Sequence, residues 1–327
     1  MSILENQNLI GIVIQTLFQF VGFGVRLEID DVPAVFLHGQ YLLDRGVPVR
    51  KIHDVRGTSY LCHRMEKVNF EVAGGKRENG EPFGYDYDEL KTDKKKYAAA
   101  YALQYRNNDA MNGKAVVEYY DDRMLVQNPP MPPLEREELD RVYNIPFCRT
   151  YHPMYEKDGG IPAIKEVKFS ITHNRGCFGG CNFCAIAYHQ GRAVRSRSVE
   201  SVVEEAKLIA SMPDFKGYIH DIGGPTANFR HPACKKQLTA GVCPDKRCLV
   251  PTPCKNLDPD HSEYVKLLSE VEKIPGIKKV FIRSGIRYDY MLLDRLHRMD
   301  FLYHLYTYKD TFCIFQEALL HIPSYLY

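Results

Sequence analysis

Three cysteines within one short stretch are the residues of this sequence with the most evident chemistry. Cys177, Cys181 and Cys184 follow a C-x3-C-x2-C spacing, and Gly179 and Gly180 stand in the first gap. Thiolates are soft ligands, so three of them on one loop suit three corners of a cubane iron–sulfur cluster. Glycine adopts positive φ angles readily, which lets the loop turn back and bring the sulfur atoms together. The fourth iron of such a cluster has no protein ligand and is open to a small molecule.

A zinc site is the first alternative for these three cysteines. Zinc in structural sites takes four ligands, often as two closely spaced pairs, and this loop supplies one ligand too few. A loop of ordinary surface thiols is the least favoured alternative, because closely spaced cysteines without a metal are prone to oxidation.

Four further cysteines follow within residues 225–258, which we predict to be an insertion. They are spaced C-x8-C-x4-C-x5-C and are Cys234, Cys243, Cys248 and Cys254. Four thiolates can close a tetrahedral zinc site or hold another cluster. The intervals match no common zinc pattern, so a set of separate buried thiols is the alternative to a second metal site.

The composition favours a folded protein of a reducing compartment. The chain has 327 residues, enough for two domains, and its 43 Lys and Arg balance 41 Asp and Glu, which gives no basic footprint for nucleic acid. Seven of the ten cysteines crowd into residues 177–254, which indicates metal chemistry rather than secreted disulfides, so we expect a cytoplasmic protein. The apolar stretch Leu9–Val25 is short for a membrane span and lacks the basic start of a signal peptide, so we expect no membrane partner.

The elements around the first cysteine group alternate between strands and helices. The predicted strands are Val167–Thr172, Tyr218–Ile222 and Lys279–Arg283. The predicted helices are one that begins after the N-cap Ser198, then Glu263–Lys273, opened by Asp260, and Tyr290–Arg298. Residues 301–306 suggest a fourth strand. Strands that alternate with helices pair in parallel, and α/β barrels carry their working residues on the loops that follow the strands.

The segment before these elements is largely polar. It predicts one surface helix at Tyr87–Asn107 and a hairpin in which Asp121 and Asp122 join Val116–Tyr120 to Arg123–Val126. Closely spaced prolines between residues 129 and 133 predict an extended linker, because proline fixes φ and removes a backbone donor. A short helix is predicted to follow the linker at Glu135–Tyr143.

The motifs around the cysteines resemble the YgiQ-type branch of the radical S-adenosylmethionine (SAM) superfamily, with Phe183 at the aromatic position of the cysteine loop. The likeness covers roughly residues 40–298. The segments that carry it are Arg175–Cys181, His189–Arg192, Ser196–Ser198, Gly223–Asn228, Gln127–Pro130 and Tyr151–Pro153.

The resemblance implies an α/β fold in two parts. We expect a partial (β/α) barrel of the radical SAM type, incomplete, at residues 136–310, preceded by a remnant of an N-terminal α/β domain and a linker at 1–135. Residues 311–327 are expected to form an atypical tail. The chain shows fewer strand–helix units than a complete barrel of this kind, so the resemblance also implies a fragment truncated at both ends.

The resemblance implies two cofactors at the first cysteine group. Cys177, Cys181 and Cys184 would hold a [4Fe-4S] cluster, and its open iron would take the amino and carboxylate groups of SAM. Phe183 would lie at the cofactor. The second cysteine group has counterparts in the same branch, so a second metal is a further expectation.

Two further pairs of residues are implied to contact SAM. Gly223 and Gly224 follow the second strand where the superfamily has a Gly-Gly-Glu segment, although Pro225 replaces the acid. Ser284 and Arg287 follow the third strand where related enzymes bind the SAM ribose or carboxylate. The alternatives are a plain tight turn for the glycines and a surface ion pair for Arg287.

The implied function is that of a radical SAM enzyme with an unknown substrate. The reduced cluster would pass an electron to the sulfonium of SAM, giving methionine and a 5′-deoxyadenosyl radical that abstracts hydrogen from the substrate. Flavodoxin or ferredoxin would supply the electron. The alternative is a non-catalytic iron–sulfur or zinc-binding protein, or an inactive fragment; a zinc-based nucleic-acid module is disfavoured by the balanced charge.

Overall fold

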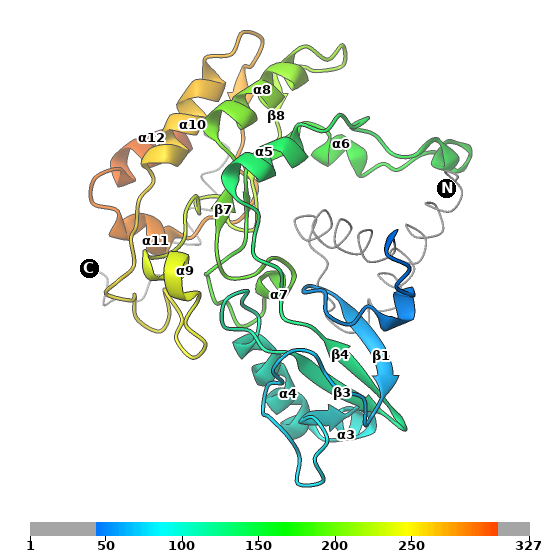
Figure 1. Ribbon diagram of the computed structural model, residues 1–327. Helices are drawn as coiled ribbons and strands as arrows, with labels where there is room; N and C mark the ends of the chain where they lie inside the picture. The colour runs from blue at the N-terminus through cyan, green and yellow to red at the C-terminus, as the bar shows by residue number, and fades with distance from the viewer. Residues whose placement is uncertain (1–43, 307–327) are drawn as a thin grey trace. The chain divides into compact units, whose positions relative to one another are not determined.

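The computed structural model describes residues 44–306 and divides them into two compact units (Figure 1). Of the described residues, unit 1 contains residues 44–133 together with the later segments Phe183–Arg192 and Lys236–Lys246. Unit 2 contains Leu134–Asn182, Ala193–Lys235 and residues 247–306. The apolar stretch Leu9–Val25 and residues 311–327, for which we made predictions, lie outside the described residues. Within residues 44–306, every helix is too short or too polar to cross a membrane.

Unit 1 is built on a four-stranded sheet. Its strand order is β1–β4–β3–β2, with β2 parallel to β3 and the other neighbours antiparallel. The strands are β1 Ser59–His63, β2 Gly84–Asp86, β3 Val116–Tyr120 and β4 Arg123–Gln127, and the short helix η1 Val49–Lys51 precedes them. The predicted hairpin of β3 and β4 is confirmed, and Asp121 takes the positive φ of 49° that its glycine-free turn requires.

The predicted single helix at residues 87–107 is two helices. They are α3 Tyr87–Thr92 and α4 Lys94–Arg106. The break is at Asp93, which is extended at φ −107° and ψ 102° and whose carboxylate accepts the backbone N–H groups of Lys95 and Lys96. An aspartate at an N-cap satisfies amides that the helix leaves unpaired, so the chain begins a new helix there instead of continuing the old one.

The helices of unit 2 surround short parallel strands. In chain order the elements of unit 2 are α5 Arg136–Tyr143, η2 Pro153–Asp158, α6 Ile164–Val167, β5 Ser170–Thr172, β6 Asn174–Arg175, β7 Arg195–Ser196, α8 Val199–Ala210, β8 Tyr218–Ile219, β9 Asp221–Gly223, α10 Ser262–Glu272, β10 Lys279–Val280, α11 Tyr288–Leu293 and α12 Arg298–Tyr306. The later segments of unit 1 carry α7 Ile186–Gln190 and α9 Lys236–Ala240.

The stretch from Tyr218 to Gly223 is the central strand of unit 2. Its second half, β9, pairs in parallel with β5, and its first half, β8, pairs in parallel with β10. The pairing of consecutive strand–helix units in parallel was predicted and is confirmed. The sheets of the described residues are small and none is closed, so the expected barrel is not confirmed.

Three helices pack together over these strands. α8, α10 and α12 lie side by side in Figure 1, with α10 in contact with both of the others. They bury Val202, Leu267 and Phe301 in one core with Ile219 and Ile222 of the central strand. Ser198 is the N-cap of α8, as predicted, and its hydroxyl accepts the N–H of Ser201 at 3.0 Å.

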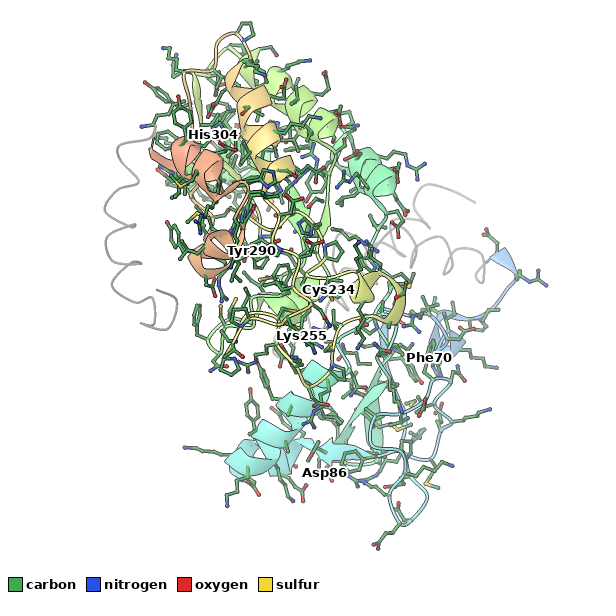
Figure 2. The ribbon with its side chains drawn as sticks, turned by 90° about the vertical axis from the view of Figure 1, so that its left-hand side faces the viewer. Phe70, Asp86, Cys234, Lys255, Tyr290 and His304 are labelled. Atoms are coloured by element: carbon green, nitrogen blue, oxygen red, sulfur yellow. The ribbon has the colours of Figure 1, made fainter. Side chains whose placement is uncertain are left out.

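The prediction of a fourth strand is wrong. Residues 301–306 are not a fourth strand but part of α12, and Phe301 and Leu305, four residues apart, are both buried on its inner face. His304 of the same helix, labelled in Figure 2, is 3.1 Å from the Ser269 hydroxyl of α10. The helix predicted to be opened by Asp260 is α10, which begins at Ser262, whose N–H donates to Asp260; Glu263 bonds to Arg136 and not to the helix start.

Candidate cluster and SAM site

The first cysteine group lies on the loop between β6 and α7. Cys177 and Cys181 belong to unit 2, and Cys184 belongs to the segment of unit 1 that follows. All three side chains are partly exposed. None of the nine cysteines in the described residues forms a disulfide. The loop therefore carries reduced thiols that can reach a ligand.

Gly179 lies beside two of the sulfur atoms. A Cβ atom at this position would be 3.3 Å from the Cys177 sulfur, 3.8 Å from the Cys181 sulfur and 3.1 Å from Nη1 of Arg287. A side chain at this position would crowd the two sulfurs and the guanidinium, so the close approach of these groups requires glycine. Gly180 has a φ of +67°, the left-handed conformation that side-chain-bearing residues avoid. The two glycines thus fit a loop that gathers thiolates around a cluster, which is the arrangement the sequence predicts.

Each cysteine sulfur has a hydrogen-bonding group near it. The Cys177 sulfur is 3.2 Å from the Thr226 hydroxyl, and the Cys184 sulfur accepts the N–H of Ile186 at 3.5 Å. The Cys181 sulfur accepts an N–H of Arg287 at 3.2 Å. Donors of this kind stabilise the negative charge of a thiolate, which is the form that binds metal.

The side chain of Phe178 anchors the loop in unit 2. It is 3% exposed and packs against Phe229 and against Tyr290, which is labelled in Figure 2. Val194 and Leu249 complete the same apolar cluster. Because Phe178 follows Cys177 directly, its burial fixes the point at which the loop leaves β6. The neighbouring Phe183 behaves oppositely and is 92% exposed.

Gly223 and Gly224 permit close contacts between two strand ends. A Cβ on Gly223 would lie 2.0 Å from the Ser284 hydroxyl oxygen, and one on Gly224 would lie 1.7 Å from Oδ1 of Asn174. The N–H of Gly224 donates to the Ser284 hydroxyl at 3.2 Å, and that hydroxyl donates to Asp221. The structure therefore brings together the glycine pair and Ser284, which the sequence assigns to the same cofactor. Asn174 was not predicted at this position.

Arg287 reaches the cysteine loop from the segment after β10. Its Nη1 donates to the Gly179 carbonyl oxygen at 2.8 Å as well as to the Cys181 sulfur, and its Nε donates to Asp289 at 2.8 Å. Burial alone would lower the pKa of Arg287, but hydrogen bonds and charge attraction to Asp289, with the nearby Cys181 and Cys177, raise it above the ordinary value. The guanidinium is therefore a fixed positive charge beside the sulfurs.

A buried histidine supports the chain just before the cysteine loop. His173 is fully buried, its Nε2 is 2.8 Å from the Ala227 carbonyl oxygen, and its Nδ1 is 3.1 Å from a nitrogen of Arg230. Since Arg230 can only donate, Nδ1 accepts and Nε2 carries the proton. Burial, helped by the charge of Arg230, holds the pKa of His173 well below its ordinary value. The ring is thus neutral and structural.

The second cysteine group is divided between the units. Cys243 lies in unit 1, where its carbonyl oxygen accepts an N–H of Arg192 at 2.9 Å. Cys234, Cys248 and Cys254 lie in unit 2, where the N–H of Cys254 donates to the Cys248 carbonyl oxygen at 2.8 Å. All four side chains are partly exposed. A second metal site at these residues stays a prediction.

In residues 44–306, one set of three metal-ligating side chains has its ligand atoms within 4.8 Å of one another: Asp260, Asp294 and His297. Both carboxylates already accept backbone N–H groups, Asp294 from His297 and Asp260 from Ser262. The hydrogen bonds that these carboxylates accept from backbone N–H groups at turns therefore explain why the three side chains lie close together. A single ion requires such closeness, whereas a cubane cluster binds each thiolate at a different iron atom and holds the sulfurs farther apart.

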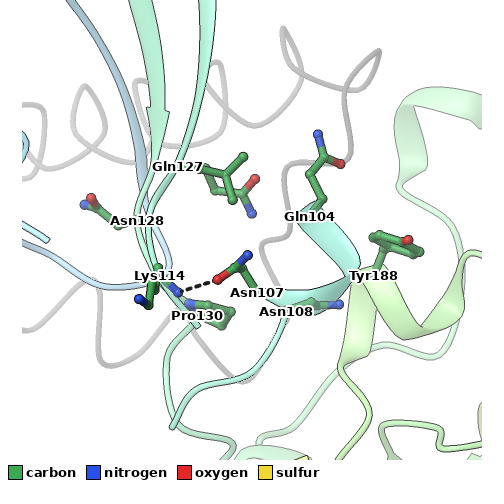
Figure 3. A pocket seen from close by; sticks show the side chains of 9 residues that line it. Gln104, Asn107, Asn108, Lys114, Gln127, Asn128, Pro130 and Tyr188 are labelled. Atoms are coloured by element: carbon green, nitrogen blue, oxygen red, sulfur yellow. Dashed lines mark hydrogen bonds between the residues drawn. The ribbon is translucent and has the colours of Figure 1, made fainter. Parts of the chain in front are cut away.

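Unit 1 contains a small polar pocket (Figure 3). Gln104, Gln127 and Tyr188 line it, and the Lys114 N–H donates to the Asn107 side chain at 3.1 Å on its wall. Its volume of about 20 Å³ has room for a water molecule or two. The pocket is too small to hold SAM or a substrate of similar size.

The sequence matches known families along most of its length. Residues 37–170 match the family described as Radical SAM N-terminal, and residues 171–306 match the Radical SAM superfamily. A UPF0313 protein of Clostridium botulinum strain 657 is 51% identical over 256 residues, which are 78% of this chain and 38% of that protein. A UPF0313 protein of Clostridium perfringens strain ATCC 13124 is 52% identical over 253 residues, 77% of this chain and 37% of that protein.

The chain thus spans well under half the length of the curated relatives that it matches. The names of these relatives state no activity. The identity is nevertheless above 50% over more than three quarters of this chain. The chain belongs to the radical SAM superfamily, in the YgiQ-type branch whose members carry the name UPF0313.

Proposed function

We propose that this chain is the cluster- and SAM-binding part of a radical SAM enzyme that acts on an unknown substrate. The observation that carries the proposal is Gly179, whose lack of a side chain lets the loop backbone lie close to the sulfurs of Cys177 and Cys181 and to the guanidinium of Arg287. A glycine framed by two thiols and a cation suits a loop that wraps an anionic cluster. In this proposal Cys177, Cys181 and Cys184 hold a [4Fe-4S] cluster, and the catalytic part corresponds to residues 136–310.

The bound cluster and SAM would together supply an electron and a 5′-deoxyadenosyl radical for hydrogen abstraction. The residues of the chain would position SAM. Gly223 and Gly224 lie where a side chain has no room, so a ligand at this strand end would meet the main chain rather than a side chain. Pro225 takes the place of an acid here, which makes main-chain carbonyl groups, Asp221 and Thr226 the candidate partners of the SAM amino group.

Ser284 and Arg287 would contact the remaining polar parts of SAM. Ser284 offers a hydroxyl between Asp221 and Gly224, and Arg287 offers a guanidinium already oriented by Asp289. Because the fork of Arg287 is already bound to Asp289, this residue would attract the SAM carboxylate through its positive charge. Phe183 would cover the cofactor with its exposed ring.

We assign the electron to a small donor such as flavodoxin or ferredoxin, and we place the protein in the cytoplasm. A reducing compartment suits a protein whose nine described cysteines form no disulfide. The second cysteine group, within the insertion at 225–258, is proposed as a second metal site of unassigned metal.

The experiment that tests this function is anaerobic reconstitution with iron and sulfide, followed by dithionite and SAM. The expected product is 5′-deoxyadenosine, and a Cys181→Ala variant is expected to form none. Cys148→Ala is the matched control, because Cys148 is exposed and lies on a separate segment. A reconstituted protein and a full-length relative that both hold an intact cluster yet release no 5′-deoxyadenosine would contradict the proposal.

A further inference from the structure

The hydrogen bond from Arg287 to the Cys181 sulfur depends on residues that do not themselves contact a cysteine sulfur. Asn228 is fully buried and binds the backbone of Arg287 on both sides. Its Oδ1 accepts the Arg287 N–H at 2.9 Å, and its Nδ2 donates to the Arg287 carbonyl oxygen at 3.0 Å. A carboxamide offers a donor and an acceptor in one plane, which a carboxylate of the same shape cannot do.

The orientation of the Asn228 amide is fixed in turn by His261. The Nδ2 of Asn228 is 3.0 Å from Nε2 of His261, and Nδ1 of His261 is 3.0 Å from Oδ2 of Asp294. Asp294 also accepts the backbone N–H of His261 at 2.8 Å. An ionised Asp294 can only accept, so Nδ1 of His261 carries a proton and Nε2 accepts from Asn228. The donors therefore run in one direction from Asn228 through His261 to Asp294, which fixes which end of the Asn228 amide faces His261.

The guanidinium of Arg287 has little freedom once its backbone is held. Asp289 accepts from Nε and from Nη2, which leaves Nη1 directed at Gly179 and Cys181. Two carboxylate bonds on one edge and two acceptors at the remaining nitrogen define one orientation of the group. A cationic donor is thus aimed at a thiolate through a rigid chain of contacts inside unit 2.

We propose that Arg287 sets the reduction potential of the cluster through its hydrogen bond to Cys181, and that Asn228 is the positioning residue that aims it. The proposal rests on the proposed function, because it requires a cluster at this loop. A reduced cluster carries one more negative charge than an oxidised one. A donor and a positive charge at the ligating sulfur stabilise that added charge and so raise the potential.

The test compares reduction potentials in variants that all keep the three cysteines. Reconstituted wild type, Arg287→Gln and Asn228→Asp are titrated anaerobically, and the reduced cluster is followed by electron paramagnetic resonance. Both variants are expected to titrate at more negative potentials than wild type while binding the same amount of iron. Arg287→Lys keeps the charge but loses the fork and is expected to shift less than Arg287→Gln.

A nearby arginine gives the matched control. Arg283 lies on the same segment and pairs with Glu166 at the surface, so Arg283→Gln is expected to leave the potential unchanged. Asp289→Asn removes the carboxylate that orients the guanidinium at a less buried position than Asn228, and it serves if Asn228→Asp fails to fold. Equal potentials in wild type, Arg287→Gln and Asp289→Asn would overturn this inference alone. Wild-type protein that assembles no cluster would overturn the proposed function and this inference with it.

Discussion

The rings of Phe178 and Phe229 stack with their centroids 3.8 Å apart and their planes 11° from parallel. This contact joins the cysteine loop to the segment that follows the glycine pair. The residues that would hold the cluster and those that would hold SAM are thereby tied to one apolar cluster, on which Tyr290 packs edge-on. The cysteine loop and the segment after the glycine pair therefore both depend on the packing of this apolar cluster.

The first prediction compares the two phenylalanines of the cysteine loop. Phe178→Ala removes a buried aromatic ring and is expected to lower the free energy of unfolding by about 3–5 kcal/mol. Phe183→Ala removes an exposed ring and is expected to change it by less than about 0.5 kcal/mol, while weakening SAM binding. Urea unfolding of the metal-free protein and calorimetry with SAM on the reconstituted protein measure these effects. Equal destabilisation by the two substitutions would contradict the packing described here.

The second prediction concerns the glycine pair. Gly224→Ala places a methyl group against Asn174 and is expected to weaken SAM binding at least tenfold, because the strand end must shift. Gly285→Ala is the control, since a Cβ at this position meets no atom within 4 Å. Its affinity for SAM should match that of wild type when both are measured by equilibrium binding. Similar losses in the two variants would mean that close packing at Gly224 is unimportant.

The third prediction concerns the start of α8. Ser198→Ala removes the side-chain acceptor of the Ser201 N–H and is expected to cost about 1 kcal/mol of unfolding free energy. Ser198→Asp keeps an acceptor and adds a negative charge at the positive end of the helix, so it should restore most of that stability. Urea unfolding distinguishes the variants, and an unaffected alanine variant would show that the cap contributes nothing.

The fourth prediction is a loss of stability at mildly acidic pH. The folded pKa of His173 is lowered by burial and by Arg230, whereas the unfolded chain has the ordinary value of about 6.5. Below that value the unfolded state takes up a proton that the folded state does not. The free energy of unfolding should therefore fall as pH decreases, by up to about 1.4 kcal/mol per pH unit for this one group. Urea unfolding between about pH 5 and pH 7 measures this slope.

The other groups with shifted pKa values either add to this slope or act at lower pH. His261 also has a pKa lowered by burial, although Asp294 partly offsets the shift, so it adds to the same slope. The lowered pKa values of Asp294 and Glu263 act only at more acidic pH, since their ordinary values lie near 4. His173→Gln supplies a neutral donor and acceptor and should flatten the slope. An unchanged slope in that variant would assign the effect to other groups.

Local patterns were the part of the structure that the sequence predicted well. The hairpin of β3 and β4 and the Ser198 cap follow from residues adjacent to each other in the chain, and both are confirmed. Residues 301–306 were assigned to a strand because they are apolar and aromatic in succession. Burial of Phe301 and Leu305 against the core makes them a helix, and that preference arises only from tertiary packing.

The candidate site also has parts that the sequence predicted and parts that it did not. The cysteine spacing, the glycines and the positions of Ser284 and Arg287 were evident in the sequence. The positions of Asn174, Asn228 and Asp289 were not, because each is defined by a contact that leaves no periodic pattern. Asn174, for example, donates to carbonyl oxygens of Thr226 and Phe229, more than fifty residues away in the chain. Such a partner is recognised only once the strands are placed.

The metal content of anaerobically purified and reconstituted protein tests the central claim most directly. The account predicts about four iron and about four sulfide per chain at the first cysteine group. It also predicts that replacing Cys177, Cys181 and Cys184 together by alanine abolishes this content, while replacing Cys62 and Cys148 does not. Wild-type protein that takes up zinc but no iron, or a triple variant whose iron and sulfide content equals that of wild type, would contradict the account.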